Sequence, residues 1–392
     1  MSLVVVSTHP IQYHAPVYRA LQARWGIPVT AIYGSDFSVA GYHDREFGTT
    51  FAWDTDLLSG YASVFLSRVG EGGAVSPEAA SAHGLRQALR RAAPRAVLLL
   101  GYRPRFHRQA FWWARREGCA LLFRGETTDV SATRGRVKGW VRDRLLRWFY
   151  SRFDKLLYIG QRSLQHYRRL GCSGRQLEFS PYCVDAAVFQ PEERDREGLR
   201  APTRQGLGLS GQQRVLLFSG KLVPRKAPDL LLRAVQALPS LVRERVVVVF
   251  LGDGQMRESL PRLARTPPPV EVRFTGFQNQ RSLSPYYHAA DVLVLPSPAE
   301  PWGLVVNEAL HHGVPCVVSS GAGCTPDLVE PGATGELFEA GSDSSLSLAL
   351  QRALGLPGDN AGLRVRCRQK VAGYSVERAA EGIAAAYGAV GE

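Results

Sequence analysis

The sequence predicts an α/β protein with two doubly wound domains, and three observations support this prediction. Short apolar runs recur along the whole chain, separated by segments long enough for a helix. Most of these runs are continuously apolar rather than alternating, which is typical of parallel strands buried on both faces. A polar stretch rich in Gly, Pro and charge, residues 190–211, divides the runs into two series, as expected of a linker.

Each series predicts five strands. The first contains LVVVST (3–8), VTAIYG (29–34), AVLLLG (96–101), ALLFRG (120–125) and KLLYIG (155–160). The second contains RVLLFSG (214–220), RVVVVFLG (245–252), VEVRFTG (270–276), DVLVLP (291–296) and PCVVSS (315–320). Strands that alternate with helices indicate doubly wound units with parallel sheets.

The length of 392 residues also favours two domains, because one core rarely organises so long a chain. We expect an N-terminal domain over residues 1–195 and a C-terminal domain over 196–372. Residues 373–392 predict a helix, capped by Ser375, that packs back toward the N-terminal domain. Ligands bind beyond the carboxyl ends of parallel strands, so we expect the two domains to face a central cleft.

The composition is that of a globular protein, with 45% hydrophobic and 21% charged residues. The six cysteines show neither a C-x-x-C pair nor zinc-ligand spacing, which favours free thiols in a reducing cytoplasm. The first residues lack the features of a signal peptide, and no window has the roughly 20 apolar residues of a membrane span. We therefore expect a cytoplasmic protein.

The formal net charge is +13, and the basic surplus lies mainly in the N-terminal half. An anionic membrane, an acidic substrate or nucleic acid could match it, but no nucleic-acid-binding motif accompanies the charge. In residues 134–155, Val137, Val141, Leu145 and Trp148 form an apolar stripe opposed by arginines. One interpretation is a helix packed on the domain core, and the other is an interfacial helix that binds anionic lipid at the inner face of a membrane.

The stretch AEPWGLVVNEALHHGVP (299–315) carries two glutamates around a turn. Pro301 and Gly303 disfavour a helix, so we expect the helix to begin near Leu304 and to end near His312. Glu300 then lies on the loop after a strand, and Glu308 lies about one turn into the helix.

The start of this helix is a potential phosphate site. The amides of Gly303, Leu304 and Val305 would point outward together with the positive end of the helix dipole. Carboxylates beside a bound phosphate would accept hydrogen bonds from neutral hydroxyls of the same ligand. A nucleotide sugar carries both phosphate and hydroxyl groups. The alternative is an exposed helix with incidental acids.

A second segment, LLFSGKLVPRKAPDLLLRA (216–234), places basic residues after another strand. Lys221 directly follows Gly220, and Arg225 and Lys226 precede the next helix. Cations on a strand-end loop can neutralise a diphosphate leaving group. The alternative is that they are solvated surface charges.

Together these segments resemble the retaining glycosyltransferases of family 4, which have the GT-B fold of two Rossmann-like domains. The family's E-x7-E pattern corresponds to Glu300 and Glu308. Two segments on either side of this pattern also resemble the family: FTGFQNQRSLSPYYHAADVLVLPS (274–297) and EPGATGELFE (330–339). A third similar segment lies earlier in the chain, GCSGRQLEFSPYCVDAAVF (171–189). Lys221 stands where the family more often has Arg, and the loop after the first strand lacks the frequent Gly-Gly.

The resemblance implies a role for each matching residue. Glu300 would contact the donor sugar, Glu308 the ribose, and Lys221 and Lys226 the diphosphate. The other implied donor-binding residues are Gly220, Arg225, Gly252, Gly254, Phe277, Trp302, Gly303, Leu304 and Val305. The donor would be a nucleotide-diphosphate sugar, most simply a UDP- or GDP-sugar, and neither metal nor cofactor is expected.

Four polar residues follow strands of the N-terminal half. His9 and His14 come after the first strand and are candidates for acceptor binding or, at His14, acid–base catalysis. Arg124 and Glu126 follow a later strand and could contact the acceptor or form a structural ion pair. The alternative for His9 and His14 is that backbone groups satisfy their hydrogen bonds and that they have no functional role.

The sequence thus predicts a retaining glycosyltransferase that moves a sugar from a nucleotide-diphosphate sugar to a saccharide or lipid-linked glycan. A sugar phosphorylase on the same fold and a catalytically silent nucleotide-sugar-binding protein are the alternatives.

Overall fold

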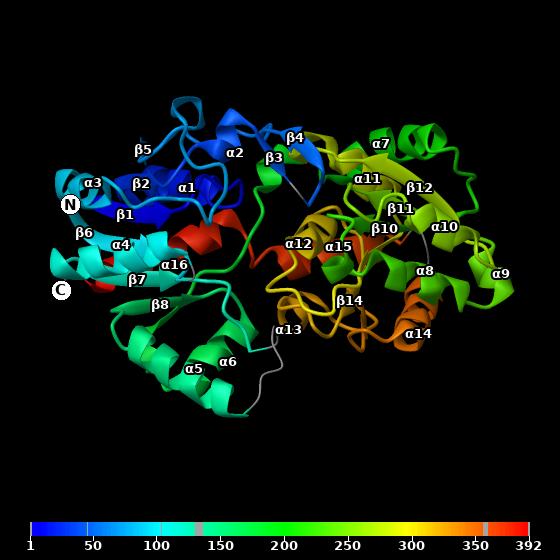
Figure 1. Cartoon of the computed structure of the whole chain (residues 1–392). Coiled ribbons are helices and arrows are strands. Elements are labelled where there is room, and N and C mark those ends of the chain that lie inside the picture. The colour runs from blue at the N-terminus through cyan, green and yellow to red at the C-terminus, as the bar shows by residue number, and fades with distance from the viewer. Residues whose placement is uncertain (1, 45, 103, 130–135, 356–359, 391–392) are drawn as a thin grey trace. The chain divides into compact units, whose positions relative to one another are not determined.

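A computed structural model describes residues 2–44, 46–102, 104–129, 136–355 and 360–390 of the chain (Figure 1). By its contacts the chain forms two units. Unit 1 comprises residues 1–42, 51–183 and 374–392, and unit 2 comprises residues 43–50 and 184–373.

Unit 1 is built on a parallel sheet in the order β5-β2-β1-β6-β7-β8-β9. Its strands are β1 (Ser2–Ser7), β2 (Val29–Tyr33), β5 (Ala62–Phe65), β6 (Pro94–Leu99), β7 (Ala120–Arg124), β8 (Lys155–Tyr158) and β9 (Leu177–Phe179). Its helices are α1 (Ala15–Trp25), α2 (Phe37–Ala40), α3 (Leu85–Ala92), α4 (Arg105–Arg116), α5 (Arg136–Tyr150), α6 (Gln161–Arg169) and α16 (Val376–Ala389).

Helices cover both faces of this sheet, because alternate residues of each buried strand point to opposite sides. Leu3 and Val5 of β1 pack in one core cluster with α1 and α16. Val4 and Val6 pack in a second cluster with α3 and α4. The expected C-terminal helix is therefore α16, and the Ser375 hydroxyl caps it by accepting a hydrogen bond from the Arg378 amide at 3.2 Å.

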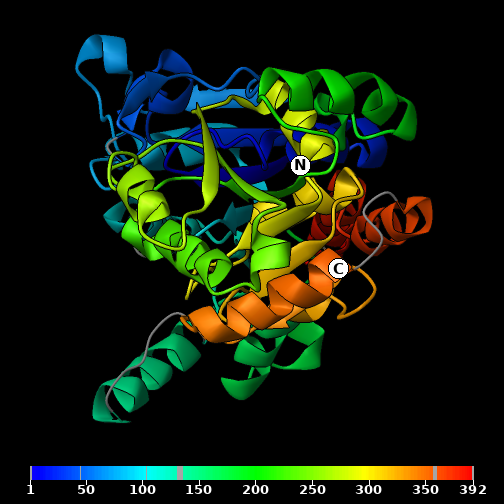
Figure 2. The same cartoon turned by 90° about the vertical axis from the view of Figure 1, so that its right-hand side faces the viewer.

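Unit 2 is built on a second parallel sheet, in the order β12-β11-β10-β13-β14-β15. Its strands are β10 (Arg214–Ser219), β11 (Val246–Leu251), β12 (Glu271–Gly276), β13 (Val292–Leu295), β14 (Cys316–Ser319) and β15 (Gly335–Phe338). Its helices are α7 (Glu193–Gly206), α8 (Pro228–Gln236), α9 (Ser240–Arg243), α10 (Leu260–Arg265), α11 (Ser284–Ala289), α12 (Leu304–His311), α13 (Thr325–Leu328), α14 (Asp343–Gly355) and α15 (Ala361–Val371). Figure 2 shows α14, in orange, lying across the face of this unit that is turned to the viewer.

The predicted fold class is confirmed, since all ten predicted strands form and both sheets are parallel. A short two-stranded sheet, β3 (Tyr42–Asp44) with β4 (Thr49–Phe51), was not predicted.

The linker predicted over residues 190–211 is wrong, because most of it forms helix α7. The polar residues that suggested a linker hold this helix in place. The Arg196 guanidinium donates to the His288 carbonyl at 3.0 Å, and Arg200 donates to Asp291 at 2.7 Å. Arg204 also reaches Asp291, at 3.4 Å. These arginines satisfy carbonyl groups at the end of α11, so a sequence rich in charge is ordered by tertiary contacts.

The stripe predicted on residues 134–155 does not pack on the core over its described part. Val141, Leu145 and Trp148 of α5 are exposed, whereas Leu146 and Tyr150 face the interior. Residues 130–135 lie outside the described part of the chain. In Figures 1 and 2, α5 lies at the margin of unit 1 beside α6.

Candidate active site

The strand order of unit 2 locates a ligand-binding edge. β10 pairs with both β11 and β13, so the order reverses between β10 and β13. At such a point, the loops that leave the two strands diverge and open a crevice at their carboxyl ends. The loops after β10 and β13, together with helix α12 (Leu304–His311), carry most of the predicted site residues.

The loop after β10 holds the basic residues. Gly220 follows the strand, and Arg225 and Lys226 lie in the short helical turn Pro224–Lys226. The loop after β11 presses against it, because a Cβ on Gly252 would lie 2.0 Å from the Gly220 carbonyl oxygen. A Cβ on Gly254 would lie 2.7 Å from the carbonyl oxygen of Leu222. Gly252 and Gly254 therefore allow two strand-end loops to touch through their backbones.

Lys226 and Glu300 meet across the strand-order reversal. The Lys226 ammonium donates a hydrogen bond to Glu300 Oε2, and both side chains are largely buried. These residues lie in two separate segments of the sequence, and the fold brings them into contact.

A neighbouring loop holds Glu300 in position. The Glu300 amide donates to the Gly321 carbonyl at 3.1 Å, and the Glu300 carbonyl accepts from the Gly323 amide at 2.9 Å. A Cβ on Gly321 would lie 1.9 Å from the Pro298 carbonyl oxygen, and one on Gly323 would lie 1.9 Å from that of Pro301. These two glycines were not predicted as part of the site, although a Gly-x-Gly pair after a strand often marks close backbone approach.

Helix α12 begins at Leu304 and ends at His311, close to the prediction. Gly303 precedes it with φ of 106°, in the left-handed region that favours glycine. The buried Trp302 donates from Nε1 to Asn307 Oδ1 at 2.9 Å, which fixes the turn against the helix. The first amides of α12, at Leu304 and Val305, belong to half-buried residues at the positive end of the helix.

Glu308 lies in the second turn of α12 and is only 3% exposed. Its Oε2 accepts a hydrogen bond from the Tyr287 hydroxyl at 2.6 Å. The Tyr287 ring stacks on His312 with 4.9 Å between the centroids, and His312 Nδ1 lies 2.7 Å from the Glu308 carbonyl oxygen. Tyr287 was missed because it lies on another helix, α11.

Lys221 and Arg225 contact acidic residues that the sequence analysis did not single out. Lys221 Nζ lies 2.9 Å from Asp44 and 2.8 Å from Glu46, and Arg225 lies 2.7 Å from Glu46. Phe277 packs edge-on against Phe47 of the same segment. No local pattern could reveal these pairings, because about 180 residues separate the partners in the sequence.

The predicted histidines lie near the carboxyl end of β1 in unit 1. His14 is buried and its Nδ1 has no hydrogen-bond partner among the described residues. Burial lowers the pKa of His14 to about 3, helped by the nearby Arg124 and His9 charges. Burial and the His107 charge lower the pKa of His9 to about 4. Both rings are therefore neutral at pH 7, the form that can accept a proton.

Arg124 and Glu126 both contact the segment around Tyr182. Arg124 donates to the carbonyl oxygens of Ser180, at 3.2 Å, and Pro181, at 2.5 Å. Its guanidinium also lies 4.9 Å from the Tyr182 ring centroid. Glu126 accepts from the Tyr182 hydroxyl at 2.9 Å. Arg124, which is 3% exposed, thus has a clear structural role in joining β7 to the chain after β9.

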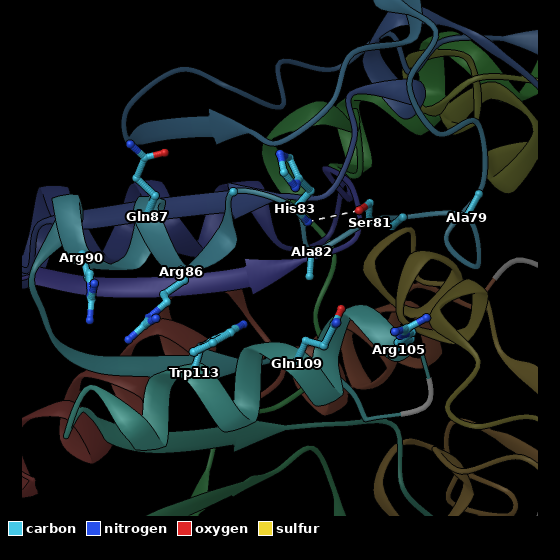
Figure 3. Close-up of a pocket in the computed structure, with 12 residues that line it drawn as sticks. Ala79, Ser81, Ala82, His83, Arg86, Gln87, Arg90, Arg105, Gln109 and Trp113 are labelled. Carbon is cyan, nitrogen blue, oxygen red and sulfur yellow. Dashed lines mark hydrogen bonds between the residues drawn. The ribbon is translucent and has the colours of Figure 1, made fainter.

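A cavity of about 810 Å³ lies between α3 and α4 of unit 1 (Figure 3). Arg86, Arg90 and Arg105 line it, but Glu117 accepts hydrogen bonds from Arg86 and Arg90 at 3.1 and 3.0 Å. The Arg86 guanidinium also stacks over Trp113. None of the predicted site residues lines this cavity.

Among the residues that the structure describes, no helix combines the length and apolar character needed to cross a membrane.

Comparison with known proteins finds a family that matches most of unit 2. The family described as "Glycosyl transferases group 1" matches residues 200–372, which contain the loops after β10 and β13 and all of α12. The D-inositol 3-phosphate glycosyltransferase of Actinosynnema mirum is 38% identical over 218 residues, and that of Salinispora arenicola is 35% identical over 214. These alignments cover 53% and 52% of this chain, and the chain spans about half the length of these curated relatives, 50% and 48%.

Solved structures resemble the whole chain. Sucrose-phosphate synthase from Thermosynechococcus elongatus has a TM-score of 0.73 at 18% identity, covering 100% of this chain and 99% of that one. Anabaena Alr3699/HepE, solved in complex with UDP and glucose, has a TM-score of 0.70 at 16% identity, covering 99% and 100%. At such identities the likeness concerns the fold. The chain thus has the GT-B fold, and its residues 200–372 match the group 1 glycosyltransferases.

Proposed function

We propose that the chain is a retaining glycosyltransferase of family 4 that transfers a sugar from a nucleotide-diphosphate sugar to a saccharide or lipid-linked glycan. The contact that carries the proposal is the Lys226–Glu300 pair beside the first turn of α12. A cation, a carboxylate and the first amides of α12 at the strand-order reversal support this proposal, because parallel sheets bind nucleotides at such points.

Each group has a distinct task in this proposal. Lys221 and Lys226 neutralise the diphosphate, and the first amides of α12 donate to a phosphate oxygen. Because Lys226 then exchanges Glu300 for phosphate, the Glu300 carboxylate becomes available to accept hydrogen bonds from the donor sugar. Glu308, oriented by Tyr287, accepts from the ribose hydroxyls.

In the retaining reaction the acceptor hydroxyl attacks the sugar C1 on the face that the diphosphate leaves. The C1–O bond to the phosphate breaks, a C1–O bond to the acceptor forms, and a diphosphate oxygen takes the acceptor proton. Neutralising the departing charge stabilises the transition state, so the reaction needs no separate protein nucleophile.

Two comparisons support the choice of substrates. The similar Anabaena structure was solved with UDP and glucose, which favours a UDP-sugar donor, with a GDP-sugar as the second candidate. The curated relatives are named D-inositol 3-phosphate glycosyltransferases, and inositol 3-phosphate is rich in hydroxyls, as a saccharide is.

We also propose that α5 brings the enzyme to an anionic membrane, where a lipid-linked acceptor would lie. Trp140 and Leu145 are each 62% exposed. Arg144 and Arg152 lie over the Trp140 and Trp148 rings, at 5.2 and 5.3 Å from the centroids. Exposed tryptophans beside arginines suit the boundary between lipid headgroups and acyl chains.

Glu300→Gln and Glu308→Gln test the function. We expect Glu308→Gln to weaken nucleotide binding by about 10-fold or more, because a charge-assisted hydrogen bond to the ribose is lost. Glu300→Gln should lower the rate of sugar transfer by about 100-fold while leaving nucleotide binding nearly unchanged, as expected for contacts to the sugar in the transition state. The nucleotide among UDP, GDP and ADP that raises the unfolding temperature most is taken as the donor nucleotide. Nucleotide sugars that contain it then serve as donors in the transfer assay.

Glu339 is exposed in the same unit, so Glu339→Gln is the matched control. This variant should bind nucleotide and transfer sugar as wild type does. Transfer at the wild-type rate in both Glu300 and Glu308 variants would contradict the proposal. Phosphate-dependent disaccharide cleavage without nucleotide would favour a phosphorylase, and tight nucleotide binding without turnover would favour a silent binding protein.

A further inference from the structure

One short segment of the chain belongs to a different unit from the residues that precede and follow it in the sequence. Residues 43–50, which we call the hairpin segment, lie between β2 and β5 in the sequence, but by their contacts they belong to unit 2. In Figure 1 the blue strands β3 and β4, which contain the two ends of this segment, lie beside elements of unit 2.

The acids of the hairpin segment pair with the basic loop after β10. Asp44 and Glu46 both bind Lys221, through Asp44 Oδ1 and Oδ2 at 3.1 and 2.9 Å and Glu46 Oε2 at 2.8 Å. Glu46 also makes a two-pronged contact with Arg225, at 3.1 Å from Nε and 2.7 Å from Nη2. The two carboxylates thus lie on Lys221, which the proposed function assigns to the diphosphate, and on Arg225, which the family resemblance assigns to the donor.

The backbone and ring contacts of the segment fall on the same site. A Cβ on Gly254 would lie 2.9 Å from the Glu46 carbonyl oxygen, so the segment runs directly over the loop after β11. Phe47 packs edge-on against Phe277 with 5.0 Å between ring centroids, and Lys221 Nζ lies 4.9 Å from the Phe47 centroid. The segment therefore contacts predicted donor-binding residues after three successive strands, β10, β11 and β12.

Hydrogen bonds within the hairpin segment fix the positions of its two acidic residues. Asp44 Oδ1 accepts hydrogen bonds from the Glu46 and Phe47 amides at 2.9 and 3.0 Å, which fixes the turn that carries both carboxylates. The Arg225 and Lys221 hydrogen bonds hold the pKa of Glu46 down to about 2, against a smaller effect of burial. Both pairings therefore persist throughout the neutral pH range.

We propose that the hairpin segment is an internal competitor for the donor, with Asp44 and Glu46 occupying Lys221 and Arg225 until a nucleotide-diphosphate sugar displaces them. This inference rests on the proposed function. Two carboxylates carry about the charge of a diphosphate, and like charges in one site exclude each other. Donor binding thus requires the segment to leave Lys221 and Arg225.

The double variant Asp44→Asn/Glu46→Gln tests the competition. The substitutions keep the shape of the turn and remove the charge, so we expect the nucleoside diphosphate selected from UDP, GDP and ADP to bind about 5- to 10-fold more tightly. The matching nucleoside, which lacks phosphate, should bind wild type and variant equally. The control Glu244→Gln/Glu258→Gln removes the same charge from exposed positions of unit 2 and should leave both affinities unchanged.

Hydrogen exchange of the wild-type chain provides a second readout. Nucleoside diphosphate should speed exchange in residues 43–50 while slowing it in residues 220–227. Unchanged or weaker binding by the Asp44/Glu46 variant, or slower exchange of 43–50 with nucleotide, would overturn the inference and leave the function standing. Failure of every nucleotide to bind both wild type and variant would instead overturn the proposed function and the inference with it.

Discussion

At the scale of single residues, the candidate site depends on glycines that allow backbones to touch. Gly321 and Gly323 leave room for the carbonyl groups of Pro298 and Pro301, on either side of Glu300. The position of the Glu300 carboxylate is therefore set partly by residues that carry no functional group. A side chain at either glycine has to push against backbone, which yields less readily than a flexible side chain.

Gly321→Ala should consequently destabilise the protein by about 1–3 kcal/mol through overpacking. Gly211→Ala is the matched control, because its Cβ would meet no atom within 4 Å. Gly211→Ala should change the free energy of unfolding by less than about 0.5 kcal/mol. Urea denaturation of both variants measures the difference, and equal stability of the two would show that the loop around Glu300 adapts freely.

At the scale of elements, the predictions from sequence succeeded for buried strands and failed at the edges. Nine of the ten predicted strands lie inside the sheets, and the tenth, β12, is an edge strand that was predicted although it carries polar residues. The strands β5, β9 and β15, which lie at sheet edges, were not predicted. In β5 exposed and half-buried residues alternate, and all of β9 is half-buried, so neither carries a long apolar run.

Helix α7 and the hairpin segment were missed for a different reason. Their order comes from charged side chains whose partners lie far away in the sequence, such as Arg200 with Asp291 and Lys221 with Asp44. Composition alone makes such stretches look like linkers or loops. The loops after β10 and β13, by contrast, were located from strand ends and helix starts, which are local signals.

The exposed apolar side chains of α5 allow the proposed membrane contact to be tested. We expect the chain to co-sediment with vesicles of phosphatidylcholine and phosphatidylglycerol, and Trp140→Ser/Trp148→Ser to reduce this binding by about 10-fold or more. High salt should also reduce it, because the arginines contribute through charge.

Leu241→Ser/Leu348→Ser is the control, because it removes two exposed apolar side chains from unit 2, 79% and 57% exposed. This variant should bind vesicles as wild type does. Binding that persists in the tryptophan variant, or that is equal for vesicles of phosphatidylcholine alone, would rule out the proposed role of α5.

At the scale of the whole molecule, buried histidines make stability depend on pH. Burial is the largest cause that lowers the pKa of His9, His107 and His311 to about 4 and of His14 and His312 to about 3. In the unfolded chain these groups titrate near about 6.5. Between these values the unfolded state binds protons that the folded state does not.

The free energy of unfolding should therefore be largest above pH 6.5 and fall as the pH drops toward 4. Each fully buried histidine contributes at most about 1.4 kcal/mol per pH unit in this window. Urea midpoints at pH 7, 6 and 5 measure the slope, and His107→Gln should make it shallower. Equal midpoints at pH 7 and pH 5 would show that these rings titrate normally in the folded protein.

The route of the chain through its two units bears on how the protein can be re-engineered. The backbone passes from one unit to the other at residues 42–43, 50–51, 183–184 and 373–374. Helix α16 completes the core of unit 1 with Ala379, Ile383 and Ala386, although it follows all of unit 2 in the sequence. A chimaera that exchanges unit 2 between relatives must therefore graft two separate pieces, 43–50 and 184–373, and return to the host sequence for the final helix.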